Sequence, residues 1–286
     1  MFLGVLIFLL FMNMGLILKL FPIDNDITDI SIKYLKAVAT GAFFITIFTC
    51  LRCYSEGMTL AKPVFFIAFI GMLINIPLDL MFVYGYFGAP KLGGVGCGIA
   101  TSIVNFLMMV ALIFYIAYSK KYKKTEPFSR FSWPSYSTNR EVFKLGFPIG
   151  LGISIELSMF SGAAVILGIL GETVVASHSI AINIASVFFM VPLSIGLAAA
   201  TRVGNLIGEE NLRQAKVSSY STIYMCMFAA LINSIIILLF RDFIVGIYTT
   251  DMLVLELAAS LLIFAAIFEL NKTSVHLNQL KVKHNL

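Results

Sequence analysis

Residues 145–170 read LGFPIGLGISIELSMFSGAAVILGIL, and this stretch decides the fold class. It is apolar almost throughout, and Glu156 is its one charged residue. A helix of this length crosses the roughly 30 Å of hydrocarbon in a bilayer at about 1.5 Å per residue. Apolar and polar residues do not alternate along it, as they do in the strands of a membrane barrel. The stretch therefore predicts a membrane-spanning α-helix.

Similar apolar runs occur along the whole chain, so we expect about eight transmembrane helices. The expected spans are 1–20, 36–53, 62–85, 93–118, 145–170, 175–200, 217–240 and 252–269. Between the fourth and fifth spans lies the longest polar segment, 119–144, and residues 270–286 form a polar tail. The expected fold class is an all-α polytopic membrane protein, with four spans in 1–118 and four in 145–269.

The composition of the 286-residue chain supports this class. Hydrophobic residues make up 59% of the chain and charged residues 12%, and the mean hydropathy is +0.95. A soluble domain carries about 25% charged residues, so this chain has too little charge to cover a water-facing surface. With 26 Phe and only 4 Cys, the chain fits neither intrinsic disorder nor a small disulfide scaffold.

The distribution of cations predicts the orientation of the helices. Seven cations lie in the segment 119–144: Lys120, Lys121, Lys123, Lys124, Arg130, Arg140 and Lys144. Cytoplasmic loops carry an excess of Lys and Arg, so we expect this loop to be cytoplasmic. Alternation of the spans then places 52–62 and 202–216 on the same side, where further Lys and Arg residues lie. The net charge of +5 needs no nucleic-acid partner to explain it.

The sequence also contains a weak internal repeat. Thr28-Asp29 opens a segment that runs to Ile47-Phe48, and Thr250-Asp251 opens a similar one that runs to Ile267-Phe268. One copy lies on each side of the basic loop. A repeated helix pair of this kind is typical of transporters built from two related halves.

Two long stretches resemble a known family. Residues 71–106 read GMLINIPLDLMFVYGYFGAPKLGGVGCGIATSIVNF, and residues 144–208 begin KLGFPIGLGISIELSMF and continue to RVGNLIG. They are similar to the fifth to eighth spans of the multidrug and toxic compound extrusion (MATE) family, in its bacterial NorM-type branch. The resemblance extends over about residues 1–268 and implies part of a two-lobed bundle of six plus six helices.

The resemblance further implies that the eight spans correspond to the third through tenth of twelve. Family members carry an Asp shortly after the segment that matches Ile267-Phe268, where this chain reads Glu269-Leu270-Asn271-Lys272. The polar residues that follow, together with this departure, are typical of a truncated or frameshifted fragment. An ordinary polar tail is the alternative.

Glu156 is the main candidate functional residue. It lies near the middle of an expected span, where a bare carboxylate is costly and should face the bundle interior or a wet cavity. Ser154, Ser158 and Ser161 offer hydroxyl groups beside it. Such a site makes protonation or Na⁺ binding accessible at neutral pH. The resemblance implies that Glu156 matches the cation-coupling glutamate of the second lobe; an interhelical hydrogen-bonding role is the alternative.

Further candidates lie in other spans. Asp79 either belongs to the site or reaches interfacial water at the outer end of its span. Asn75 and Asn183 either line a cavity or join helices. Pro192 lies within its span and is a candidate hinge, although a proline there is also an ordinary helix kink. The sequence shows no metal-ligand cluster beyond a possible Na⁺ at Glu156.

The combined reading predicts a secondary active multidrug exporter in the bacterial inner membrane. It would exchange Na⁺ or H⁺, with no other cofactor, for small cationic amphiphilic drugs, and we expect a monomer in contact with lipid. No Walker loop, Ser-His-Asp arrangement or zinc spacing occurs, so no enzyme is predicted. The alternatives are a lipid-linked oligosaccharide flippase or polysaccharide exporter of related fold, and an inactive truncated remnant. A flippase should show a basic intramembrane cavity, and no Lys or Arg lies deep in an expected span.

Overall fold

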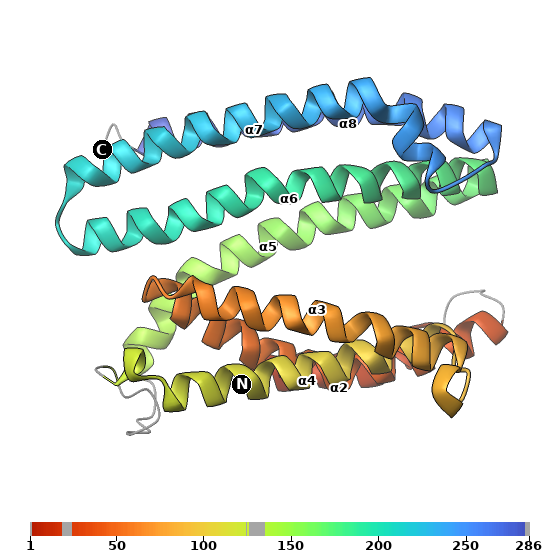
Figure 1. Cartoon of the computed structure of the whole chain (residues 1–286), viewed down its shortest axis with the longest axis horizontal. Coiled ribbons are helices and arrows are strands. Elements are labelled where there is room, and N and C mark those ends of the chain that lie inside the picture. The colour runs from red at the N-terminus through yellow and green to blue at the C-terminus, as the bar shows by residue number, and fades with distance from the viewer. Residues whose placement is uncertain (1, 19–24, 124, 126–134, 284–286) are drawn as a thin grey trace. The chain divides into compact units, whose positions relative to one another are not determined.

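The structure is a computed structural model that describes residues 2–18, 25–123, 125 and 135–283. In this part of the chain all regular structure is helical (Figure 1), which confirms the all-α fold class. The elements in chain order are α1 (Phe2–Leu18), α2 (Asn25–Gly57), α3 (Ala61–Tyr84), η1 (Tyr86–Gly88), α4 (Gly94–Tyr118), η2 (Lys120–Tyr122), α5 (Tyr136–Leu167), η3 (Gly168–Leu170), α6 (Glu172–Gly208), α7 (Leu212–Gly246) and α8 (Met252–Lys283).

Most of the described α-helices are long and apolar enough to cross a membrane. By length and composition six qualify: Thr28–Gly57, Ala61–Tyr84, Gly94–Tyr118, Tyr136–Ala163, Glu172–Gly208 and Leu212–Gly246. The expected spans 1–20 and 252–269 correspond to shorter apolar helical stretches, α1 and Met252–Phe268 of α8. The α-helices thus follow the order of the expected spans, and the chain is a polytopic membrane protein.

Several helices extend beyond the apolar runs. The helix α2 begins at Asn25 and not at 36, α5 begins at Tyr136 inside the expected loop, and α8 continues to Lys283 through most of the expected polar tail. The added segments contain neither Gly nor Pro, so nothing in them breaks a helix. At Ser135, Oγ accepts a hydrogen bond from the Thr138 amide at 3.2 Å and so caps the start of α5. Residues 126–134 of the expected loop lie outside the described part of the chain.

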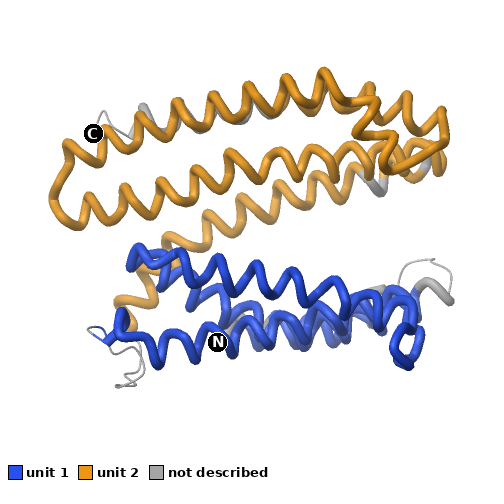
Figure 2. Tube along the Cα trace, viewed as in Figure 1, with its two compact units in different colours: residues 1–131 blue, residues 132–286 orange. Residues whose placement is uncertain are grey.

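The chain divides into two compact units, residues 1–131 and 132–286 (Figure 2). The first unit holds α1 to α4 and the second holds α5 to α8. Within the first, α2 packs on α1 and α4, and α3 packs on α4; within the second, α6, α7 and α8 pack on one another.

Small residues bring the helices of the first unit close together. A Cβ added to Gly96 of α4 would overlap the carbonyl of Phe82 in α3, and one added to Gly41 of α2 would lie 2.9 Å from the Cα of Ser102. At Ser102, Oγ donates to the carbonyl of Ala37 in α2 at 2.7 Å. Close backbone approach and hydroxyl-to-backbone bonds are the usual means of joining helices in lipid.

The second unit uses the same kind of contact. From α6, Ser177 shares its hydroxyl hydrogen between the carbonyl of Thr173 in its own helix, at 2.7 Å, and that of Val254 in α8, at 3.1 Å. Ser234 of α7 donates to Ala266 of α8 at 3.1 Å. Both serines are buried. Around them lies an apolar core: Ala181, Ile184, Ile237, Val245, Ala258, Ala259, Leu262 and Ala266. These contacts fix the faces that α6, α7 and α8 turn toward one another.

Candidate functional site

Glu156 lies on the more enclosed side of α5. Its apolar neighbours Ile153, Leu157 and Met159 are 54%, 61% and 71% exposed, whereas Glu156 is half-buried. Within its own unit, α5 contacts α6 and η3. In a bilayer, the apolar residues of such a helix can face lipid while the carboxylate avoids it. Within this stretch of α5, Glu156 is therefore less exposed than the apolar residues around it.

One of the serines beside Glu156 forms a hydrogen bond within its own helix. Ser158 donates its hydroxyl to the carbonyl of Ser154 at 2.7 Å, within the same helix. Serines in membrane helices often bond to their own backbone in this way.

Asn183 and Pro192 lie on opposite sides of α6, since successive residues of a helix turn by about 100°. Asn183 is exposed, and its Oδ1 accepts a hydrogen bond from the Tyr248 hydroxyl, just after α7, at 2.9 Å. Pro192 is buried inside the helix, which continues unbroken from Glu172 to Gly208. Asn183 therefore contacts the end of α7, whereas Pro192 lies in the packed interior.

Asn75 and Asp79 lie one turn apart on the same face of α3. Both are half-buried, while Leu73, Ile76 and Leu80 between and around them are exposed. The Oδ1 atom of Asp79 is buried and has no hydrogen-bond partner among the described residues. Buried polar atoms normally have partners, so this oxygen has capacity for a proton, a cation or water.

Cys97 of α4 connects this carboxylate to a hollow in the first unit. The Cys97 thiol lies near the side chains of Asp79 and Thr101. It also lines an open hollow of about 530 Å³, together with residues of α2 and the start of α4: Ile30, Ser31, Tyr34, Leu35 and Gly94. The first unit thus has a mostly apolar recess, and one of its lining residues, Cys97, lies near the Asp79 carboxylate.

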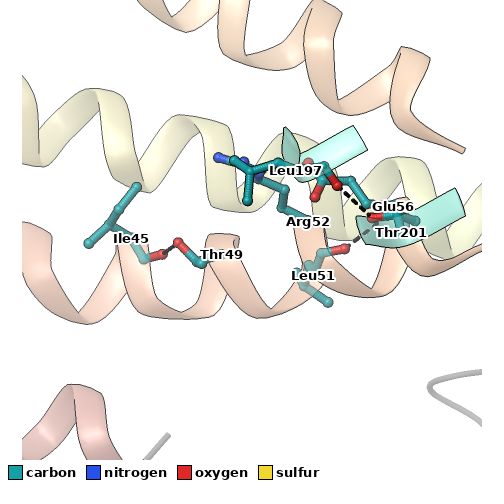
Figure 3. A network of polar contacts seen from close by, with 8 residues as sticks. Ile45, Thr49, Leu51, Arg52, Glu56, Leu197 and Thr201 are labelled. Carbon is teal, nitrogen blue, oxygen red and sulfur yellow. Dashed lines mark hydrogen bonds and ion pairs between the residues drawn. The ribbon is translucent and has the colours of Figure 1, made fainter. Parts of the chain in front are cut away.

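The end of α2 carries a local polar network (Figure 3). Arg52 Nε and Glu56 Oε1 form an ion pair of 2.7 Å, and Thr49 and Ser55 donate their hydroxyls to the carbonyls of Ile45 and Leu51. Each partner lies one turn along the same helix. Arg52 is thus neutralised at the expected cytoplasmic end of its span. Among the described residues no group of three or more His, Cys, Asp or Glu side chains could hold a metal ion.

Sequence reasoning did not single out Asn233, Tyr248 or Cys97. Asn233 is 6% exposed in α7 and donates from Nδ2 to the carbonyl of Phe188 in α6 at 2.8 Å. An amide within the apolar run 217–240 was a usable signal, because intramembrane amides join helices or line cavities. The partners of Tyr248 and Cys97 are tertiary contacts, which have no counterpart in local sequence.

Comparison with known proteins extends over nearly the whole chain. The family model MatE matches residues 1–81 and 148–273, which is one segment in each compact unit. The multidrug resistance protein NorM of Vibrio vulnificus (strain YJ016) is 39% identical over 253 residues, or 88% of this chain and 56% of that protein. The multidrug resistance protein MdtK of Proteus mirabilis is 35% identical over 94% of this chain and 59% of its own length.

Solved structures show the same fold. The eukaryotic MATE transporter AtDTX14 matches with a TM-score of 0.82 at 22% identity, over 95% of this chain and 60% of the transporter. A MATE protein in the bent conformation matches with a TM-score of 0.73 at 20% identity, over 94% of this chain and 59% of its own. The chain thus spans somewhat more than half the length of its relatives, which are named as resistance proteins or transporters. The chain belongs to the MatE family, the family of the MATE transporters.

Proposed function

We propose that the chain is part of a secondary active exporter of the bacterial inner membrane, which exchanges an inward-moving cation for cationic amphiphilic drugs. The observation that carries the proposal is Glu156, a half-buried carboxylate in the apolar part of α5 that begins at Leu145. The chain belongs to a family whose members include proteins named for multidrug resistance, and this membership supports the proposal of drug export. A carboxylate in this position attracts a cation because each charged group in lipid needs a compensating partner.

The coupling ion is Na⁺ or H⁺. Both bind to a carboxylate, and binding of either removes the cost of its bare charge in the membrane. Binding of the ion at Glu156 would stabilise one arrangement of the helices, and binding of drug would stabilise another, so that the two ligands exchange. Asp79 and Asn75 form a second polar site in the first unit, and Asn183 and the bending point at Pro192 complete the set of proposed residues.

Dye accumulation in bacterial cells that lack their own drug exporters tests this proposal. Cells that express the membrane-inserted 286-residue chain should accumulate several-fold less ethidium than cells with an empty vector. Glu156→Gln should abolish the difference, because the amide keeps the shape but cannot be charged. Glu172→Gln is the matched control, since Glu172 is exposed in the first turn of α6.

Two results would contradict the proposal at different levels. Equal accumulation with the inserted chain and with the empty vector would show that this chain is an inactive remnant. Undiminished efflux with Glu156→Gln would remove Glu156 from the coupling site but leave export standing. Export of a lipid-linked oligosaccharide in place of the dye would favour the flippase. Against that alternative, every described Lys and Arg lies away from the middles of the expected spans.

A further inference from the structure

Pro192 leaves one carbonyl of α6 without its helical donor. A proline inside a helix lacks the N–H that would donate to the carbonyl four residues earlier. For Pro192 this is the carbonyl of Phe188. The helix nevertheless continues from Glu172 to Gly208, and Asn233 Nδ2 of α7 donates to the Phe188 carbonyl at 2.8 Å. The neighbouring helix thus supplies the missing hydrogen bond.

The surroundings of this bond are packed and largely apolar. Pro192 is buried, and Asn233 is 6% exposed. Cys226, Ala230, Asn233 and Ile237 follow one another at helical spacing and so form one face of α7. Ala230 and Ile237 are each 1% exposed, and Cys226 Sγ lies 3.7 Å from the Pro192 carbonyl, to which it donates. In packed, largely apolar surroundings a carbonyl without a hydrogen-bond donor is costly in free energy. The Asn233 amide therefore stabilises the helix by donating to the Phe188 carbonyl.

The other prolines beyond the first turn of the described helices lie in different surroundings. Pro63 is buried too, but it lies in the first turn of α3, where its missing N–H removes no helical hydrogen bond. Pro77 of α3 and Pro148 of α5 are both exposed, whereas Pro192 is buried. A kink on an exposed helix face can be accommodated by lipid-side adjustment of the backbone. At a buried proline the neighbouring helix has to provide the compensation.

We propose that Asn233 is the positioning residue of α6, which holds the helix in place at Pro192 by replacing the hydrogen bond that the proline removes. This deepens the proposed role of Pro192 as a bending point and rests on that proposal for its link to transport. The hydrogen bond itself is a property of the folded chain. Its contribution can therefore be measured without any assay of drug export.

A double-mutant cycle on the full 286-residue chain in mixed detergent–lipid micelles tests the inference. Asn233→Leu keeps the size of the side chain but removes the donor, and it should raise the ratio of unfolded to folded protein about fivefold. Pro192→Ala restores an N–H that donates to the Phe188 carbonyl. In that background Asn233→Leu should change the ratio less than twofold, since the amide is no longer needed. Unfolding is followed by helical circular dichroism during titration with sodium dodecyl sulfate.

Ser234→Ala provides the matched control. Ser234 is the next residue of α7 and donates to Ala266 of α8, so its loss should have the same effect with proline or alanine at 192. If Asn233→Leu alone does not fold, recovery of folded protein in the double variant supports the inference. Equal loss from Asn233→Leu in both backgrounds would overturn it, as would a Ser234→Ala effect that also disappears with Pro192→Ala. Either result is independent of whether the chain exports ethidium.

Discussion

Two glycines of the spanning helices have opposite surroundings, although both lie in regular α-helix. At Gly96 of α4 the backbone of α3 occupies the space that a side chain would need. At Gly152 of α5, on an exposed stretch of the helix, an added Cβ meets no atom within 4 Å. The first glycine therefore serves helix contact, and the second has no such role in the described structure.

Gly96→Ala should destabilise the chain by about 1–3 kcal/mol, because the methyl group forces α3 and α4 apart. Gly152→Ala should be neutral or stabilise by up to about 1 kcal/mol, since alanine is the better helix former. The measurement is the free energy of unfolding in sodium dodecyl sulfate for both variants. Equal effects at the two positions would contradict the close approach of α3 and α4.

At the scale of whole elements, α7 and α8 each begin with a side-chain cap. The Asn211 Oδ1 atom accepts from the Gln214 amide at 3.2 Å, and the Asp251 Oδ1 atom accepts from the Leu253 amide at 2.9 Å. Asp251 belongs to the repeated Thr-Asp pair, yet its counterpart Asp29 lies within α2, which begins earlier at Asn25. The two similar sequences therefore occupy different positions relative to their helix starts.

Asp251→Ala should cost about 1 kcal/mol, because the first turn of α8 loses its acceptor. Asp251→Asn should have little effect, since the amide oxygen can accept the same bond. Hydrogen exchange at the Leu253 amide reports this directly: exchange should be faster in the alanine variant and near normal in the asparagine variant. Fast exchange in both would show that charge, and not the cap, stabilises this helix start.

The order and type of the helices could be predicted from the sequence, because about 20 apolar residues in a row have few alternatives to a spanning helix. Their ends could not. The segments 25–35, 136–144 and 270–283 are polar, so they do not register as spans, yet they contain no residue that stops a helix. The length of an apolar run shows which residues lie in lipid. The ends of a helix depend instead on capping residues such as Ser135 and on residues that break a helix.

The candidate residues show the same division. Glu156 stands out in sequence because a charge in an apolar run is rare. In the structure it is half-buried. The hydrogen-bond partner of Asn183, which is Tyr248, comes from the turn after α7, and the thiol nearest Asp79, that of Cys97, comes from α4. Asn233 lies far along the chain from Phe188, and the need for it follows from Pro192 only once α7 is known to pack there.

At the scale of the whole molecule, the distribution of cations predicts the orientation in the membrane. In a variant whose four native cysteines are replaced by serine, Ser137→Cys should not react with a membrane-impermeant maleimide in intact cells. It should react once the cells are permeabilised, because the reagent then reaches the cytoplasmic side of the membrane. Thr250→Cys should react from outside intact cells. Both positions are exposed. The reverse labelling pattern would show that segment 119–144 faces outward. The excess of Lys and Arg would then not mark the cytoplasmic side of this chain.

The hydroxyl donors that join helices have one further consequence. Ser102, Ser177 and Ser234 all donate to backbone carbonyls, those of Ala37, Val254 and Ala266. Every residue type offers the same carbonyl, so each bond depends on the identity of the donor alone. During evolution the acceptor positions can therefore exchange among compact residues without a matching change in the partner. Such helix pairs should leave little trace of correlated substitution, even though they are among the most intimate contacts in the protein.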